Sequence, residues 1–145
     1  MMRAVDTNVL VYAHRVDASH HEKARRLVVE MAEGKEPWAV PWPCFYEFVR
    51  VVTHPRIFRD PSTVEDAFHD VRVLLSSPTL QCLGETQRHE QVLAEVIRET
   101  PVVGNTVHDL HIAVLLREHG VTEIVTGDTD FHRFKGLRVT NPFKN

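Results

Sequence analysis

Apolar and polar residues follow two different repeats along this chain, one typical of buried strands and one typical of helices. Short apolar runs predict five strands, at residues 3–5, 38–41, 79–83, 122–126 and 137–141 ("RAV", "WAVP", "TLQCL", "TEIVT" and "LRVTN"). Between these runs, apolar residues recur three or four positions apart, as in Ala24, Leu27, Val28 and Met31. That spacing puts them on one face of a helix, so the pattern predicts strands that alternate with helices.

Capping and breaking residues predict where the helices begin and end. Two S-x-x-E capping boxes, Ser19 to Glu22 and Ser62 to Glu65, precede apolar stripes, and the first of these helices is expected to end near Gly34. Four further helices are expected: at residues 9–14 ("VLVYAH"), from Pro43 to His54-Pro55, around residues 92–97, and from Thr106 to Gly120.

The alternation of strands and helices predicts a parallel sheet with helices on both faces. We find no repeat, linker or low-complexity segment, and 145 residues is the size of one compact domain, so residues 1–145 are expected to form a single α/β domain. Cys44 and Cys82 lack a CxxC spacing and are expected to be free thiols.

Composition narrows the class of protein further. Apolar residues make up 43% of the chain, as in globular proteins, yet no apolar run approaches the ~20 residues of a membrane helix. The N-terminus does not resemble a secretory signal, so we expect a cytoplasmic protein. A net charge of −3 argues against a broad nucleic-acid-coating surface, although it allows a basic groove beside an acidic site.

Carboxylates stand where the predicted strands end. Asp6 follows the first strand, and Asp128 and Asp130 follow the strand at 122–126. Because loops at the carboxyl ends of parallel strands face one crevice, these acids are expected to lie close together. Asp109, in the first turn of the helix that begins at Thr106, is a fourth candidate.

Some of these acids also have an ordinary structural explanation. Asp109 can close a capping box with Thr106. Glu47 lies opposite the apolar stripe of its helix and can pair with Arg50 on a solvated face, a contact worth ~0.2–0.5 kcal/mol. Both acids therefore fit a structural role and a role in a site, and the sequence leaves the choice open.

The aspartates after the strands are harder to explain structurally as a group. Asp128 and Asp130 suit turn and N-cap positions, but an unpaired carboxylate buried at Asp6 would cost several kcal/mol. Two carboxylates 4 Å apart repel by about 4 kcal/mol at an effective dielectric near 20. The nearest basic residues, Arg3 and Arg133, lie several positions away, so a hard divalent cation such as Mg²⁺ or Mn²⁺ is the expected counter-charge.

Four segments resemble the acidic motifs of PIN-domain nucleases, and more narrowly those of VapC-type toxins. They are "DTNVLVYA", "CFYEFVRVVTHP", "NTVHDLHIAVLLREHG" and "IVTGDTDF", in matching order and spacing. The resemblance implies a three-layer α/β/α fold around a mainly parallel sheet of four to five strands. It also implies catalytic roles for Asp6, Glu47, Asp109 and Asp128, metal coordination by Asp6, Asp109, Asp128 and Asp130, and support from Asn8 and Thr126.

The same resemblance implies a function. It points to a metal-dependent endoribonuclease that uses Mg²⁺ or Mn²⁺ to hydrolyse RNA phosphodiester bonds, with tRNA or rRNA as candidate substrates. It further implies a homodimer that a cognate VapB-type antitoxin holds inactive. Two alternatives are a non-catalytic RNA-binding or interaction module of the same fold, and a haloacid-dehalogenase-like phosphatase, although that class has aspartate where this chain has Asn8.

Candidate RNA contacts are less distinct than the acids. The candidates for phosphate contact are Arg25, Arg26, Arg50, Arg56, Arg59, Arg133 and Lys135, and those for base stacking are Trp38, Trp42 and Tyr46. Among ten histidines, His108 and His111 are expected to line the substrate groove. No third ligand stands at a metal-site spacing from them, so the sequence does not predict a zinc site.

Overall fold

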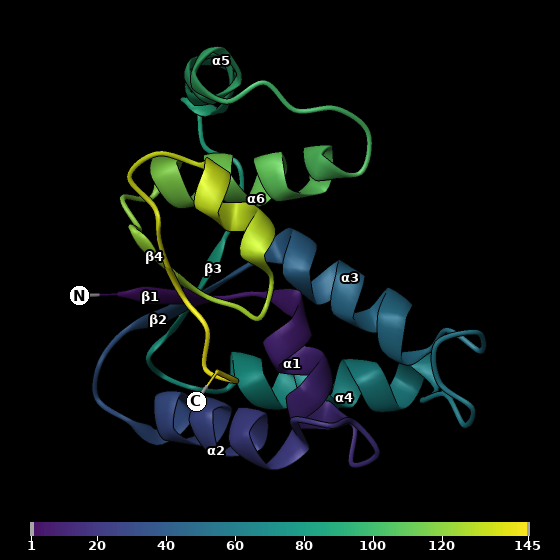
Figure 1. Ribbon diagram of the computed structural model, residues 1–145. Coiled ribbons are helices and arrows are strands. Elements are labelled where there is room, and N and C mark those ends of the chain that lie inside the picture. Colours follow the sequence, from purple (N-terminus) through teal and green to yellow (C-terminus); the bar gives the residue numbers. More distant parts are fainter. Residues whose placement is uncertain (1, 145) are drawn as a thin grey trace.

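The computed structural model describes residues 2–144 and contains a five-stranded sheet with helices on both faces (Figure 1). In chain order its elements are β1 (Arg3–Val5), α1 (Thr7–His14), α2 (His21–Glu33), β2 (Trp38–Pro41), α3 (Trp42–Val52), α4 (Val64–Leu75), β3 (Leu80–Leu83), α5 (His89–Glu99), α6 (Thr106–Glu118), β4 (Glu123–Val125), the short 3-10 helix η1 (Thr129–Arg133) and β5 (Arg138–Thr140). The predicted α/β architecture is confirmed.

All neighbouring strands of the sheet are parallel, in the order β3-β2-β1-β4-β5. The chain leaves β1 toward β2 on one side and returns to β4 on the other, so the strand order reverses between β1 and β4. In parallel sheets such a reversal opens a crevice at the carboxyl ends of the two strands. Val5 is in register with Val125, and the residues that follow them, Asp6 and Thr126, therefore meet at this crevice.

The helices form the two outer layers. Figure 1 shows α5, α6 and η1 on one side of the sheet and α1, α2 and α4 on the other, with α3 running out from the end of the sheet. Helix α6 is buried on most sides, as its nearly continuous apolar sequence predicts, and Ile112, Val114 and Leu115 are fully enclosed. Trp38 and Phe131 are the largest side chains enclosed in the core.

The predicted capping boxes are wrong at both helices. Helix α2 begins two residues after Ser19, at His21, and its N-cap His20 makes no side-chain capping bond with the described residues. Ser62 does not cap α4, because its hydroxyl is bonded to His14 Nε2 at 2.8 Å. The adjacent Thr63 is the cap, and its Oγ1 accepts from Asp66 N at 3.0 Å.

Part of the predicted apolar stripe of α4 faces outward. Ala67 and Val71 are buried, whereas Val64 and Phe68 are more than half exposed. Both cysteines are free, with Cys44 buried and Cys82 partly buried, as expected. Within residues 2–144, no helix has both the length and the apolar character needed to cross a membrane.

Candidate active site

Asp6 lies at the carboxyl end of β1 and is held by hydrogen bonds on both carboxylate oxygens. As the N-cap of α1, it accepts from Thr7 N at 2.7 Å through Oδ1. Its Oδ2 accepts from Thr126 Oγ1 at 2.8 Å and from Asn8 Nδ2 at 3.2 Å. Burial raises the pKa of Asp6, and the charge of Asp128 raises it further, although the bonds from Thr126 and Thr7 act in the opposite direction.

Asn8 and Thr126 join the ends of β1 and β4 across the crevice. Asn8 Nδ2 donates to Thr126 Oγ1 at 2.8 Å, and Asn8 Oδ1 accepts from Gly127 N at 2.9 Å. The Thr126 hydroxyl also accepts from Asp128 N at 2.9 Å. The loop that carries Asp128 is thus fixed relative to Asp6 by two uncharged side chains.

The structure brings three further aspartates together. Carboxylate oxygens of Asp109, Asp128 and Asp130 lie within 4.8 Å of one another. Asp128 caps η1 through a bond from Asp130 N at 2.9 Å, so both of these acids are positioned by one turn. The capping explanation of Asp109 is wrong, because Thr106 Oγ1 is bonded to Val103 O and N and no side chain among the described residues caps α6.

The pKa of Asp109 is raised by its burial and by the neighbouring carboxylates. Its pKa is raised to about 6, first by burial and then by the charges of Asp128, Asp6 and Asp130, while His108 lowers it in part. Since Asp6 appears among these charges, all four aspartates face one region. Arg133 lies 3.7 Å from Asp130 Oδ1 and offsets only part of this charge.

Glu47 contacts Arg50 and lies at the acidic cleft, so its position is compatible with both interpretations of the sequence. It forms a two-bond ion pair with Arg50, at 2.5 and 3.1 Å, and this guanidinium lowers the pKa of the carboxyl. Glu47 also lines the same cleft as Asp6, Asp109 and Asp128. Its side chain is only 27% exposed, so the ion pair sits at the edge of the cleft.

The residues present fit a hard divalent cation. The clustered donors are carboxylate oxygens, which Mg²⁺ and Mn²⁺ prefer. Burial and then the charges of Asp128, Asp6 and Asp130 raise the pKa of Asp109, and a bound cation would offset those charges. Asp109, Asp128 and Asp130 are the residues placed to hold such an ion, and Asp6 faces them.

The cleft has a volume of about 350 Å³ and one apolar wall. Beside the acids, Tyr12, Val51, Ile57 and Phe58 line it. The sequence reading missed these residues. Tyr12 was detectable, because it lies four positions after Asn8 and therefore on the same face of α1.

The stacking candidates named from sequence lie elsewhere. Trp38 is in the core, whereas Trp42 and Tyr46 are exposed on α3 and do not belong to the described lining of the cleft. His108 lines the cleft, as expected. The expectation for His111 is wrong, because it is bonded to Glu85 on another side of α6.

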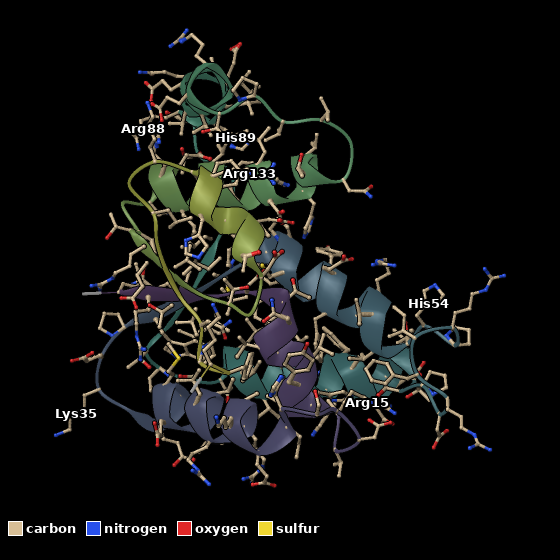
Figure 2. All side chains as sticks on the ribbon, in the orientation of Figure 1. Arg15, Lys35, His54, Arg88, His89 and Arg133 are labelled. Atoms are coloured by element: carbon tan, nitrogen blue, oxygen red, sulfur yellow. The ribbon has the colours of Figure 1, made fainter. Side chains whose placement is uncertain are left out.

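Basic residues lie on several sides of the molecule (Figure 2). Arg50 and Arg133 pair with Glu47 and Asp130. Arg56 and Arg59 are exposed and immediately flank the cleft residues Ile57 and Phe58. These last two arginines are thus the basic residues that adjoin the apolar lining in sequence.

Comparisons with known proteins agree with this geometry. The family model for the PIN domain matches residues 3–137. Ribonuclease VapC43 of Mycobacterium tuberculosis is 36% identical over 141 residues, which cover 97% of this chain and 95% of that protein. Ribonuclease VapC48 of the same organism is 33% identical over 143 residues, 99% of each chain.

Solved structures show the same fold at lower sequence identity. VapBC2 from Rickettsia felis, bound to a DNA fragment from its promoter, matches with a TM-score of 0.70 and 20% identity over 97% of this chain and 98% of that one. Mycobacterium tuberculosis VapC20, a Sarcin-Ricin loop cleaving toxin, matches with a TM-score of 0.65 and 17% identity over 94% and 98%. These likenesses support the three-layer architecture.

Proposed function

This chain belongs to the PIN-domain family, and from that premise we propose that it is an endoribonuclease, the toxin of a VapBC-type toxin–antitoxin pair. It hydrolyses RNA phosphodiester bonds with a divalent cation, Mg²⁺ or Mn²⁺, held by carboxylates. The full-length similarity to VapC ribonucleases, at 30–36% identity, supports this activity.

The observation that carries the proposal is the convergence of four aspartates from three distant segments on one cleft. Asp6 directly follows β1, Asp109 lies in α6, and Asp128 and Asp130 come from the turn and the short helix η1 after β4. A fold gains no stability from like charges placed together. A site that holds a cation against a phosphate needs this arrangement.

Each residue of the site has a proposed role. Asp109, Asp128 and Asp130 would hold the ion together with Asp6, while Asn8 and Thr126 keep Asp6 oriented. A bound Mg²⁺ or Mn²⁺ supplies Lewis-acid stabilisation of the phosphate charge and lowers the pKa of a coordinated water. Glu47 is kept ionised by Arg50 and accepts a hydrogen bond from the attacking water at the edge of the cleft.

RNA is proposed to cross the cleft along its apolar wall. Tyr12 and Phe58 offer aromatic faces for base stacking, and Arg56 and Arg59 can contact phosphates. A second hollow of about 380 Å³ shares Tyr12 and Asp128 with the first and adds His20 and Lys144. Because the two hollows share these residues, we propose that they form one continuous path past Asp128.

A VapB-type antitoxin is the proposed partner. VapBC complexes are among the solved structures of the same fold. On this chain, Tyr46 is 77% exposed and Trp42 is 40% exposed on α3, the helix that also carries Glu47, and such aromatic residues are enriched at protein interfaces. From the same family relationship we propose that the protein forms a homodimer and acts in the cytoplasm.

The activity is tested by incubating the purified protein with total RNA. Cleavage is expected with Mg²⁺ or Mn²⁺ and absent with EDTA. Asp109→Asn is expected to slow cleavage roughly a hundredfold or more, since several kcal/mol of charge stabilisation depend on the ion. Asp66→Asn, an exposed acid on α4, is the matched control and is expected to cleave at the wild-type rate.

A folded Asp109→Asn protein that still cleaves RNA like the wild type would contradict the assignment of the site. Specific RNA binding without cleavage by the wild type under all metal conditions would instead favour the non-catalytic module.

A further inference from the structure

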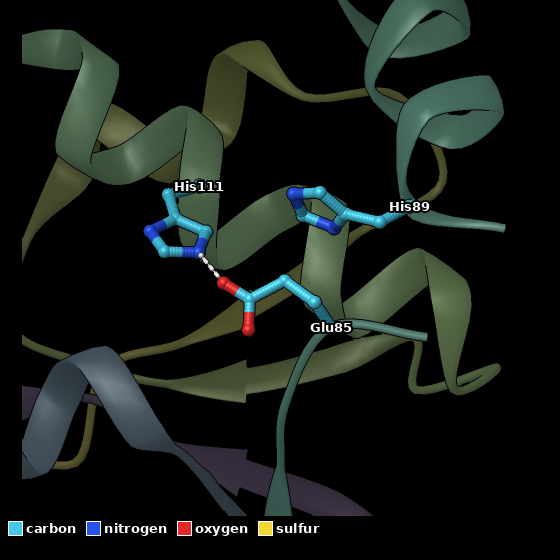
Figure 3. A group of neighbouring side chains, drawn as sticks. All are labelled: Glu85, His89 and His111. Carbon is cyan, nitrogen blue, oxygen red and sulfur yellow. Dashed lines mark hydrogen bonds and ion pairs between the residues drawn. The ribbon is translucent and has the colours of Figure 1, made fainter. Parts of the chain in front are cut away.

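A second group of potential metal ligands lies on the opposite side of α6 from Asp109. Glu85 precedes α5, His89 begins α5 and His111 lies in α6, two positions after Asp109. Two positions correspond to about 200° around a helix, so His111 faces away from the acidic cleft. One ligand atom from each of the three residues lies within 4.8 Å of the other two (Figure 3).

The three side chains point toward one another. His111 Nε2 is 2.9 Å from Glu85 Oε1. The rings of His89 and His111 meet edge to face, with 5.9 Å between their centroids. Figure 3 shows Nε2 of His89 turned toward His111, which leaves a space bounded by two imidazole nitrogens and one carboxylate.

The other nitrogen of His89 is fixed by Glu118. His89 Nδ1 lies 2.5 Å from Glu118 Oε2, and the Glu118 side chain is completely buried. With Nδ1–H donating to Glu118, the lone pair of the His89 ring lies on Nε2, the nitrogen that faces the cluster.

Such a carboxylate behind a histidine is the usual support of a metal-binding imidazole, because it fixes the tautomer and the ring orientation. Glu118 is itself held by Thr86, whose N and Oγ1 donate to Oε1 at 2.9 and 2.7 Å. The supporting shell of a metal site is therefore already in place.

From this geometry we propose that Glu85, His89 and His111 bind one divalent transition-metal ion of the Zn²⁺ class. Two imidazoles and one carboxylate suit Zn²⁺ and leave a fourth position for water, whereas Mg²⁺ prefers oxygen ligands alone. The site lies outside the proposed nuclease cleft and does not depend on that function.

The ligand atoms need only small movements to reach an ion. Bonds of 2.0–2.2 Å in a tetrahedron place ligand atoms about 3.3 Å apart. Glu85 and His111 are 54% and 37% exposed, so their side chains are free to rotate. An ion bound between them would replace the direct contact of His111 Nε2 with Glu85 Oε1.

The ion would add a further link between α6, α5 and the connection between β3 and α5, which Thr86 already joins to Glu118. Helix α5 packs on α6, and Figure 1 shows it as the outermost element of its layer. Ligands from α6, from α5 and from the connection between β3 and α5 would lock α5 in place. Two separate ion pairs, His89 with Glu118 and His111 with Glu85, are the alternative explanation of the cluster.

The test is a calorimetric titration of the chelator-treated full chain with Zn²⁺ in excess Mg²⁺, which competes for the acidic cleft. We expect one Zn²⁺ per chain. A hundredfold excess over the Kd is expected to raise the thermal midpoint by roughly 5–10 °C. Glu85→Gln and His111→Gln are expected to weaken binding at least tenfold, with RNA cleavage in Mg²⁺ unchanged.

Two controls separate this site from others. His69→Gln, an exposed histidine on α4, and Asp109→Asn, in the acidic cleft, are both expected to bind Zn²⁺ like the wild type. Equal affinity in Glu85→Gln, His111→Gln and wild type, or binding lost only in Asp109→Asn, would overturn the proposal.

Visible absorption of bound Co²⁺ tests the proposal on the unmutated chain, so the test does not depend on whether a variant folds. Co²⁺ bound by two imidazoles and a carboxylate is expected to show the intense visible absorption of four-coordinate cobalt. Only the weak absorption of six-coordinate cobalt would also overturn the proposal.

Discussion

Thr126 is a single residue on which the geometry of the acidic cleft depends. Its side chain is fully buried and its hydroxyl makes three hydrogen bonds, donating to Asp6 and accepting from Asn8 and Asp128 N. One hydroxyl has one donor and two acceptor positions, so Thr126 uses all of them. It is a positioning residue that acts through Asp6 and Asp128.

Thr126→Val keeps the shape of the side chain and removes all three bonds. We expect the free energy of unfolding to fall by about 1–3 kcal/mol, because Asp6 loses a buried donor. RNA cleavage is expected to fall with it in fully folded protein. Urea unfolding and cleavage assays measure the two effects, with Thr79→Val, remote from the cleft, as the control for losing a threonine hydroxyl.

Asp109 predicts a pH dependence of the metal-free protein. Its pKa is 3.8 in an unperturbed chain and about 6 in the folded state. Between these values the folded state binds more protons than the unfolded state, so the free energy of unfolding falls as pH rises from about 4 to about 6. The raised pKa of Asp6 acts in the same direction.

After discounting for solvent screening of a half-exposed group, the Asp109 contribution is on the order of 1 kcal/mol. Urea unfolding in EDTA across this pH range measures it. Asp109→Asn is expected to flatten the slope, and an unchanged slope in that variant would mean that Asp109 ionises normally.

At the scale of elements, the ends of helices depend on tertiary partners as well as on local sequence. Ser19 and Ser62 each begin an S-x-x-E pattern, yet neither caps a helix. The Ser62 hydroxyl is instead hydrogen-bonded to His14 and Arg15, which lie in another segment. The turn before α2 extends past Ser19 to His20, which is the N-cap. A capping pattern shows that a side chain could bond the first backbone N–H groups of a helix. Whether it does so depends on competing hydrogen bonds from other parts of the chain.

Because Thr63 caps a helix and Ser19 does not, we expect only the substitution of Thr63 to lower the stability clearly. Thr63→Ala removes the side-chain bond to Asp66 N and is expected to cost about 1 kcal/mol of stability. Ser19→Ala is expected to stay within about 0.5 kcal/mol of the wild type, since Ser19 is exposed and caps nothing. A comparable loss in both variants would show that the sequence-based cap at Ser19 exists in solution.

At the scale of the whole molecule, the proposed ion in the acidic cleft would link three parts of the chain. Its proposed ligands come from the residue after β1, from α6 and from the segment after β4, which are distant in sequence. An ion that binds the folded state alone stabilises it by mass action. The fold and the site are then coupled.

We therefore expect Mn²⁺ or Mg²⁺ at a hundredfold excess over its Kd to raise the free energy of unfolding by about 2.7 kcal/mol, and EDTA to reverse the change. Asp109→Asn should show little of this gain. Thermal unfolding monitored by circular dichroism measures it, and a metal effect of full size in Asp109→Asn would place the ion elsewhere.

Much of this architecture was predictable from the sequence. The periodicity of apolar residues located all five strands and the helices, because burial on one face is a local property of a regular backbone. The position of Asp6, Asp128 and Asp130 after strands predicted one shared edge, because all strands run parallel. The catalytic and metal-binding roles of these residues, and the single-domain organisation of residues 1–145, stay predictions.

What the sequence determined by itself was therefore the set of elements, the parallel sheet and the strand ends that carry acids. Only the tertiary structure decided which side chains meet: Thr126 with Asp6 across the crevice, Glu47 both at the cleft and on Arg50, and His111 with His89 and Glu85 behind α6. Backbone periodicity is set by neighbours a few residues apart. Convergence of side chains depends on sheet order and helix packing, which no short stretch of sequence contains.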